Sequence, residues 1–305
     1  MKVLITGGAG YIGSELVYKL AKNKAVKEII IYDNLHRESF NFFIGVRKID
    51  HSNIRFVRGD ILDGRKLRKV LDGVDVVYHL AANVTTPFAD QNPHFFEQVN
   101  HWGTAELSNA IEKSNVTKFI YVSSVSVYGS QSEMVTSETS LNPRTFYGIS
   151  KKRGEEHVTR LFDKLPTYIA RSGNVFGYSK GLRIDAVINK FMFDAQFESK
   201  ITIHGDGNQT RAFIEIGRLV SYLDAMLKSD LPSGHFNLVD KNLSVLDVVD
   251  TIRELYPSLE MIFVNQHLKM REIQVEKDPN ALKLVELKDR SLIDELSDFK
   301  RMFTF

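Results

Sequence analysis

The stretch Lys-Val-Leu-Ile-Thr-Gly-Gly-Ala-Gly-Tyr-Ile-Gly, residues 2–13, decides how this chain is built. A short apolar run leads directly into Gly7, Gly10 and Gly13, and a helical pattern follows from about Tyr11 to Lys22. In a strand–turn–helix unit the first glycine permits the tight turn. The second lets backbone amides approach a pyrophosphate, and the third allows the helix to pack closely on the strand. The helix N-terminus then faces the phosphates, so the stretch predicts a dinucleotide site.

Short apolar runs alternate with amphipathic stretches through the first half of the chain. The patterns predict strands at 2–6, 28–32, 53–58, 74–79, 118–123 and 166–170, and helices at about 11–22, 63–71, 95–113 and 146–162. Nearly continuous apolar strands separated by helices are typical of a parallel sheet covered on both faces. We therefore predict an α/β fold with a doubly wound parallel sheet of the Rossmann type.

This alternation ends after Gly173. The remainder predicts strands at 200–204, 235–239 and 260–264, and short helices near 215–228, 244–255 and 279–285. We interpret residues 1–173 as an NAD-binding domain and residues 174–305 mostly as a smaller α/β substrate lobe. A later segment, roughly 212–240, is expected to return to the first domain.

Composition excludes several classes of function. The 305 residues carry a net charge of +2, which gives no electrostatic case for nucleic acid or acidic lipid. The chain has no cysteine, which removes disulfides and thiol catalysis, and its nine histidines show no metal-ligand spacing. We predict no metal. Because Met1 leads straight into the first predicted strand and no run approaches about 18 apolar residues, we expect a cytoplasmic protein without membrane contact.

An acidic residue follows the second predicted strand. Asp33 lies 20 residues after Gly13, where a carboxylate binds the adenosine ribose diol and repels a 2′-phosphate. The cofactor prediction is therefore NAD rather than NADP, although Arg37 nearby acts against that preference. Asp60 and Ile61 follow the third strand and are placed beside the adenine ring, with a helix cap as the alternative.

Two pairs match the pattern Tyr-x-x-x-Lys. Tyr18 and Lys22 lie within the first helix, where the pattern is an ordinary contact between residues four apart. Tyr147 and Lys151 begin a later helix, after a strand that ends in Ser123-Ser124. That places a phenol, an ammonium and a hydroxyl at the strand ends, beside the reacting end of the dinucleotide.

In combination the motifs resemble those of extended short-chain dehydrogenases/reductases, in the NAD-dependent nucleotide-sugar epimerase/dehydratase family (UDP-glucose 4-epimerase-like). The motifs are the glycine turn, Gly-Asp-Ile-Leu-Asp from Gly59, His-Leu-Ala-Ala from His79, Ser-Ser-Val-Ser-Val-Tyr-Gly from Ser123, Tyr-Gly-Ile-Ser-Lys, Arg-Ser-Gly-Asn-Val-Phe-Gly from Arg171, and Gly-Asp-Gly-Asn-Gln-Thr-Arg from Gly205. The resemblance runs nearly from end to end.

The resemblance implies three catalytic residues. Ser124 hydrogen-bonds the reacting sugar oxygen (Ser126 is the alternative), Tyr147 is the base, and Lys151 binds the nicotinamide ribose. An unperturbed tyrosine has a pKa near about 10. We expect the Lys151 ammonium and the positive charge of oxidised nicotinamide to bring the pKa of Tyr147 towards neutrality.

The binding residues implied by the resemblance form two sets. The predicted cofactor contacts are Gly7, Gly10, Tyr11, Ile12, Gly13, Asp33, Asn34, Asp60, Ile61, Leu80, Ala81, Ala82, Asn100, Tyr147 and Lys151. The predicted substrate contacts are Thr85, Ser124, Ser126, Tyr147, Asn174, Arg211 and Arg271. Within the second set, Asn174 and the two arginines are assigned to the diphosphate, since a guanidinium donates paired hydrogen bonds to phosphate oxygens. Arg183 is a weaker candidate for the same role.

The reaction is less sharply defined. In the family, 4,6-dehydratases carry an acidic pair just after the catalytic hydroxyl residue, whereas Val125 and Ser126 stand there in this chain. We therefore expect an epimerase acting on a nucleotide-diphosphate sugar, with an NAD(P)H-dependent 4-keto-sugar reductase as the alternative and a 4,6-dehydratase or a non-catalytic NAD sensor as lesser ones. In relatives the helices predicted at 95–113 and 146–162 pair with those of a second copy into a four-helix bundle, which predicts a homodimer. The apolar surface for it is expected from Phe95, Phe96, Trp102, Val158, Leu161 and Phe162.

Overall fold

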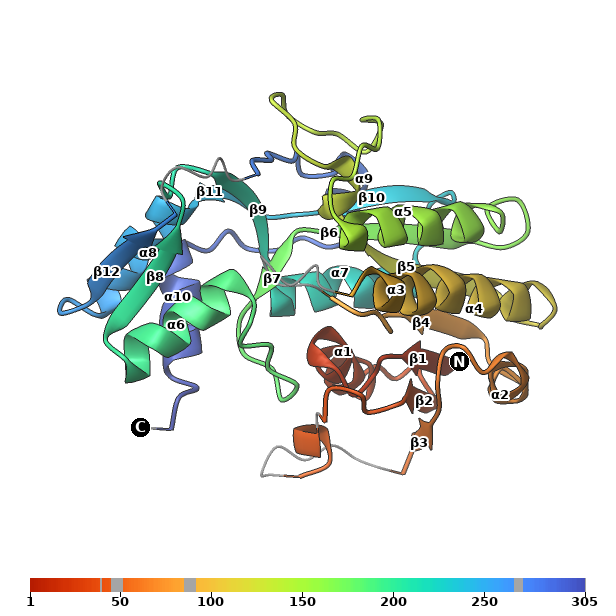
Figure 1. The fold of residues 1–305 in the computed structure, drawn as a ribbon. Coiled ribbons are helices and arrows are strands. Elements are labelled where there is room, and N and C mark those ends of the chain that lie inside the picture. The colour runs from red at the N-terminus through yellow and green to blue at the C-terminus, as the bar shows by residue number, and fades with distance from the viewer. Residues whose placement is uncertain (39, 45–51, 85–91, 266–270, 305) are drawn as a thin grey trace.

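The computed structural model describes residues 1–38, 40–44, 52–84, 92–265 and 271–304. Its centre is a seven-stranded sheet in the order β10-β6-β5-β4-β1-β2-β3, and every neighbouring pair is parallel (Figure 1). The strands are β1 (Lys2–Thr6), β2 (Glu28–Asp33), β3 (Ile54–Arg58), β4 (Val76–His79), β5 (Lys118–Ser124), β6 (Thr167–Ser172) and β10 (Gly234–Leu238). The chain order reverses between β1 and β4, which creates a crevice at their carboxyl ends. The predicted doubly wound α/β fold is confirmed.

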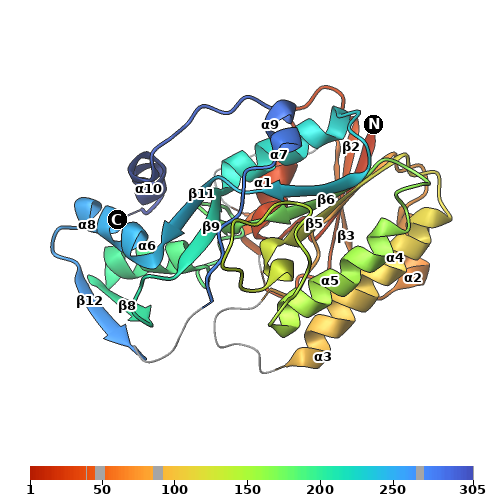
Figure 2. The same cartoon turned by 90° about the horizontal axis from the view of Figure 1, so that it is seen from above.

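Helices cover both faces of this sheet (Figure 2). One face carries α1 (Tyr11–Leu20) and α7 (Ile216–Lys228), and the other carries α2 (Gly64–Val70), α4 (Gly103–Glu112) and α5 (Phe146–Thr159). Within β1, Val3 and Ile5 pack into the first layer while Leu4 packs into the second, all fully buried. Two buried faces explain why the strands are apolar at nearly every position.

The long helix predicted at 95–113 is divided into three. A short α3 (Pro93–Phe96) continues into the π-helix η2 (Glu97–Trp102) and then into α4. Asn100 lies in the π-helix with its side chain fully buried, and its amide bonds to Asn83 and to Ser150 of α5. A π-turn inserts an extra residue per turn and is frequent near functional sites. Here it carries an amide that joins the chain after β4 to α5.

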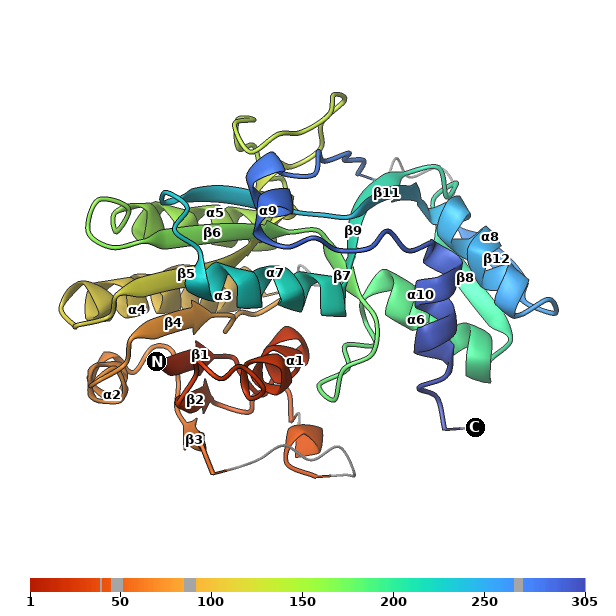
Figure 3. The same ribbon diagram turned by 180° about the vertical axis from the view of Figure 1, so that it is seen from behind.

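The second half of the chain adds a lobe with two small sheets. One has β7 (Asn174–Phe176), β9 (Thr210–Glu215) and β11 (Lys241–Ser244); the other pairs β8 (Lys200–His204) with β12 (Glu260–Val264). The helices α6 (Val187–Phe197), α8 (Val245–Leu255) and α10 (Leu292–Lys300) pack there around a separate core. Before α10, α9 (Pro279–Leu284) lies against α7 and β10, and the connection from α9 to α10 crosses back to the lobe (Figure 3).

The strands and helices predicted for the second half are all present, within a few residues of the predicted bounds. The sequence pattern did not reveal β7, β9, β11, α6 or α10.

The apolar surface predicted for a dimer is mostly covered within the monomer. Phe96, Val158 and Leu161 are buried, and Phe95 and Phe162 are half-buried beside His36 and His235. Trp102 is 56% exposed and Phe146 45% exposed, so the apolar surface on this side comes from them. Among the described helices, none is both long and apolar enough to cross a membrane.

Candidate functional site

The glycine turn leaves no room for side chains. Gly7 has φ +71°, and a Cβ there would lie 2.6 Å from the backbone nitrogen of Ala81. A Cβ on Gly13 would lie 2.2 Å from the carbonyl oxygen of Gly7, so helix α1 could not start so close to β1. The turn thus has the close backbone packing that a pyrophosphate site at a helix N-terminus requires.

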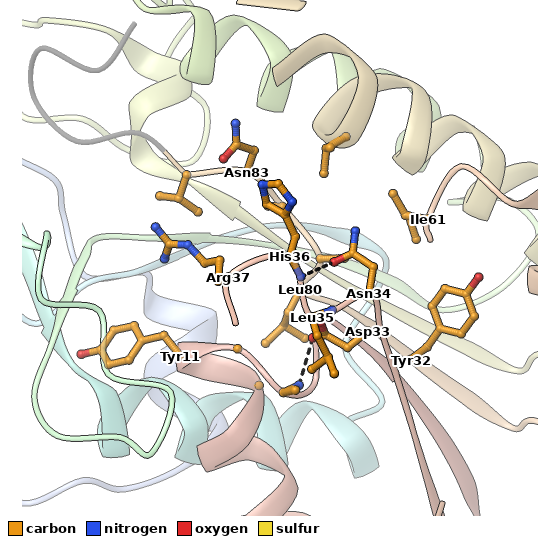
Figure 4. Close-up of a pocket in the computed structure, with 18 of the residues that line it drawn as sticks. Tyr11, Tyr32, Asp33, Asn34, Leu35, His36, Arg37, Ile61, Leu80 and Asn83 are labelled. Atoms are coloured by element: carbon orange, nitrogen blue, oxygen red, sulfur yellow. Dashed lines mark hydrogen bonds between the residues drawn. The ribbon is translucent and has the colours of Figure 1, made fainter. Parts of the chain in front are cut away.

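A pocket opens beside this turn at the carboxyl ends of β1, β2 and β4 (Figure 4). Twelve predicted cofactor residues line it, namely Gly7, Gly10, Tyr11, Ile12, Gly13, Asp33, Asn34, Asp60, Ile61, Leu80, Ala81 and Ala82. The other three predicted cofactor residues, Asn100, Tyr147 and Lys151, are not part of the lining. The buried side chain of Asn100 supports the pocket wall through Asn83. The lining also includes residues outside the predicted set, among them Tyr32, His36, Phe95 and Arg183.

Asp33 is held firmly at the end of β2. Its carboxylate accepts hydrogen bonds from the backbone N–H groups of Ala9 (3.1 Å) and Leu35 (2.8 Å). Burial raises the pKa of Asp33, and these two donors act against that rise. Nearby, the Asn34 amide donates to the Asp60 carboxylate, which joins the ends of β2 and β3. The turn, this carboxylate and the pocket between them fit an adenosine diphosphate with a free ribose diol.

The predicted catalytic residues lie where the end of β5 meets the start of α5. Lys151 is 2% exposed, its Nζ donates to the carbonyl of Val122 at 2.7 Å, and it lies 4.2 Å from the centre of the Tyr121 ring. Burial lowers the pKa of Lys151 to about 7. Tyr147 is half-buried, and the neighbouring Ser124 hydroxyl lowers its pKa. The structure thus brings the predicted hydroxyl, phenol and ammonium together.

The electrostatics of Tyr147 differ from the prediction. Burial raises its pKa, and the groups that act against burial are the Ser124 hydroxyl and the Arg183 guanidinium, not Lys151. The reason is that burial lowers the pKa of Lys151 to about 7, so the lysine is neutral at the pH where the phenol would ionise. Without further positive charge nearby, the phenol is therefore held in its protonated form.

Ser124 has a second role in the fold. Its Oγ accepts a hydrogen bond from the backbone N–H of Ser126 and caps the short helix η3 (Val125–Tyr128). The two hydroxyls are 3.1 Å apart. The structure therefore places Ser126 within reach of the same oxygen that Ser124 is expected to contact.

The predicted diphosphate residues gather on the small sheet of the lobe. Asn174 starts β7 and Arg211 lies in β9, the strand beside it, while the backbone of Ile273 bonds to Thr210 and brings Arg271 alongside. Burial and the positive charge of Arg271 lower the pKa of Arg211 to about 10. Two guanidiniums in mutual repulsion are suited to bind an anion. Thr85, the remaining predicted substrate residue, lies outside the described residues.

The segment 177–186, here called the strap, joins β7 to α6 and lies against the glycine turn. Ser179 Oγ is 2.7 Å from the carbonyl of Tyr11 and 2.8 Å from the hydroxyl of Ser14. Tyr11 in turn donates its hydroxyl to the carbonyl of Gly177. A Cβ on Gly181 would lie 2.7 Å from the backbone of Gly10. The lobe is therefore bonded directly to the turn expected to bind pyrophosphate.

Within the strap, Asp185 bonds to two arginines that line the pocket. The Nε of Arg183 is 3.1 Å from one carboxylate oxygen, and a guanidinium nitrogen of Arg37 is 3.6 Å from the other. Arg37 is thus directed partly towards the lobe. Arg183, the weaker of the predicted diphosphate arginines, therefore lies at the edge of the cofactor pocket beside Asp185.

Comparisons with known proteins agree with this geometry. The family model described as "NAD dependent epimerase/dehydratase family" matches residues 3–238. A dTDP-D-glucose 4,6-dehydratase of Dictyostelium discoideum is 32% identical over 82% of this chain, which spans 61% of that relative's length. An uncharacterized UDP-glucose epimerase of Bacillus subtilis is 31% identical over 84% of this chain and 82% of its own length.

The structure also resembles solved ones. The UDP-glucuronic acid 4-epimerase of Bacillus cereus, solved with UDP-glucuronic acid and NAD, superimposes with a TM-score of 0.85 at 27% identity. The match covers 99% of this chain and 98% of that one.

Proposed function

The chain belongs to the NAD dependent epimerase/dehydratase family, and from this premise we propose that it is a nucleotide-sugar epimerase acting at C4 of the sugar. NAD is the cofactor of the family, and structural neighbours contain it. The substrate proposed is a sugar carried on a nucleoside diphosphate, as in the UDP-sugar complex of the Bacillus cereus enzyme.

One observation separates epimerisation from dehydration. Loss of water from C5 and C6 needs an acid and a base beside the catalytic hydroxyl, whereas η3, which follows Ser124, has no acidic residue in its first turn. Val125 is buried, and the hydroxyl of Ser126 is bonded to Ser124. Epimerisation needs no proton donor there. The sequence similarity to dehydratases is thus not matched by the residues that dehydration would use.

The residues that would bind NAD can be assigned from the pocket. The turn from Gly7 to Gly13 would bind the pyrophosphate, Asp33 the adenosine ribose, and Lys151 the nicotinamide ribose. When bound, NAD supplies a hydride acceptor that returns the hydride in the second half of the reaction. It also brings a positive charge, which the raised pKa of Tyr147 requires before the phenol can act as a base.

The chain's own residues then act on the sugar hydroxyl. Tyr147 removes the hydroxyl proton as the C4–H bond breaks, and the Ser124 hydroxyl donates a hydrogen bond to the oxygen as it becomes a ketone. Arg183 favours the phenolate through its charge. After the ketone has turned over, Tyr147 returns the proton to the oxygen, and the hydroxyl has the opposite configuration.

We further propose that residues 174–305 form mostly the sugar-nucleotide lobe, with Asn174, Arg211 and Arg271 on the diphosphate. A homodimer through the outer sides of α4 and α5, with Trp102 in the contact, and a cytoplasmic location complete the proposal. The exposed indole supports the dimer, because large exposed apolar side chains mark contact surfaces.

The test uses Tyr147→Phe. We expect native mass spectrometry to find NAD on both proteins, and NMR to show the wild type interconverting a UDP-hexose pair without net consumption of NADH. The Tyr147→Phe variant should retain NAD and lose turnover by about 10²–10⁴-fold.

Tyr18→Phe is the matched control, since Tyr18 belongs to the other Tyr-x-x-x-Lys pattern and is buried in α1; it should remain active. Stoichiometric NAD(P)H consumption would replace the epimerase by a 4-keto-sugar reductase. Full activity of Tyr147→Phe would contradict the mechanism.

A further inference from the structure

Three successive residues at the end of β5 each act on a residue of α5. Val122 accepts a hydrogen bond from Lys151, Ser123 donates its hydroxyl to Glu155 at 2.5 Å, and the Ser124 hydroxyl lowers the pKa of Tyr147. The three partners on α5 are spaced four residues apart and therefore lie along one side of the helix. The mechanism uses Tyr147 and Lys151, and it leaves Glu155 without a role.

Glu155 is a buried carboxylate with an elaborate set of partners. Glu155 is 3% exposed. Its two carboxylate oxygens accept hydrogen bonds from Nε (3.1 Å) and Nη2 (2.8 Å) of Arg171. Arg171 is itself 3% exposed and pairs in register with Ser123 across β6 and β5. Burying two charges carries a desolvation cost that packed apolar residues would avoid, so such a pair is weak evidence for stability. Its position beside Lys151 indicates a different purpose.

Among the residues that the structure describes, no charged side chain bonds to the nitrogen of Lys151. Its bond to Val122 and its contact with the Tyr121 ring are both to neutral groups. The titratable and charged groups that face it or lie behind its neighbours are His79 of β4, Tyr121 of β5, Arg171 of β6, and Tyr147 and Glu155 of α5. Burial holds the pKa of His79 far below its usual range, so this ring stays neutral. Only Glu155 in this set supplies a negative charge at neutral pH.

We propose that Glu155 is a positioning residue for the catalytic lysine. Its carboxylate, anchored by Ser123 and Arg171, keeps the buried Lys151 ammonium charged and in place. The proposal rests on the proposed function only in taking Lys151 as the group that binds the cofactor ribose. In agreement with it, the charge of Glu155 acts against the burial that lowers the pKa of Lys151.

The experiment titrates Lys151 directly, by NMR of the ¹³C-labelled lysine side chain in the protein without sugar. The wild-type midpoint is expected at about pH 7. In Glu155→Gln it should fall by about one pH unit, because a nearby opposite charge is lost. Glu156→Gln is the control, since this neighbour on α5 is exposed and its loss should leave the midpoint unchanged.

Glu155→Gln leaves Arg171 buried without its partner and risks failure to fold. The double variant Glu155→Gln/Arg171→Met removes both charges and should show the same fall, because Arg171 is not among the groups that shift the pKa of Lys151. An unmoved midpoint in either folded variant would overturn the proposal.

A second readout separates positioning from mere structural support. In the holoenzyme, the alkaline limb of kcat should move to lower pH by about the same amount while KM for the sugar stays within about twofold. A uniform loss of kcat at every pH would mean a structural role and overturn the proposal. If the wild type proves inactive on every nucleotide sugar yet the midpoint still falls, the proposed function fails and the role of Glu155 stands.

Discussion

Replacing Lys151 with methionine should make the apo protein more stable at low pH while destroying its activity. The lysine has a pKa of about 7 in the folded protein, against an ordinary value of 10.5. Between these values the unfolded chain binds more protons than the folded one, so wild-type stability rises with pH across this window. The cost of the buried ammonium is fully present below about pH 7 and disappears above about pH 10.5. The difference between the two pKa values corresponds to about 5 kcal/mol in the free energy of unfolding.

Part of the stability gained by removing the ammonium is offset by contacts that methionine loses. Methionine fills the same space but loses the hydrogen bond to Val122 and the contact with the Tyr121 ring, together worth about 2–3 kcal/mol. We therefore expect Lys151→Met to exceed the wild type by about 2–3 kcal/mol at pH 6. Because the remaining cost of the ammonium is about 2 kcal/mol at pH 9, the two stabilities should cross near there.

Urea unfolding of the apo proteins at pH 6 to 10 measures this difference. Lys152→Met, at the half-buried neighbouring position, is the control and should show no such dependence on pH. A wild type that is the more stable protein at every pH, or a difference that does not vary with pH, would refute the reasoning.

Three further changes test other parts of the site. Gly13→Ala should lose about 3 kcal/mol of stability and NAD binding, because its Cβ would lie 2.2 Å from the carbonyl oxygen of Gly7; urea unfolding and calorimetry measure both. Arg183→Gln removes a charge that lowers the pKa of Tyr147, so the acid limb of kcat should move to higher pH. Ser179→Ala breaks the bond between strap and turn and should speed NAD release about five- to tenfold in a displacement assay.

The first two of these changes have a matched control. Gly10→Ala should cost less stability, since its Cβ would lie 3.2 Å from the same oxygen. Lys180→Gln, also in the strap, should leave the acid limb in place. If Ser179→Ala releases NAD at the wild-type rate, the strap does not govern retention of the cofactor.

The sheet could be predicted from sequence because its strands are buried on both faces. Residues such as Leu4 and Ile5 then form an unbroken apolar run, which only a covered parallel strand produces. The glycine turn could also be predicted, since close backbone packing requires glycine at Gly7, Gly10 and Gly13. In the lobe, β7 has three residues and β11 has four. Strands this short carry too few alternations to show a period, and their pairing depends on distant segments.

The candidate site also has a part that the sequence predicts and a part that it does not. Residues of the pocket that lie on the glycine turn or at a strand end were predicted, because motif and position fix them together. Arg183 was considered only for the diphosphate, and Glu155 was not predicted, since its partners Ser123 and Arg171 lie on two other elements of the fold. The pKa of Tyr147 differed from expectation because burial lowers the pKa of Lys151 to about 7, which leaves the lysine neutral where the phenol would ionise. Sequence spacing shows which residues share a helix face, but not how each one is solvated.

The strap has a consequence for the physiology of the protein. If the nicotinamide coenzyme leaves only when the bonds from Ser179 and Tyr11 open, each protein molecule keeps the same coenzyme molecule through many catalytic cycles. We then expect turnover to be insensitive to the ratio of oxidised to reduced coenzyme in the surrounding medium. The supply of sugar nucleotide alone would set its flux.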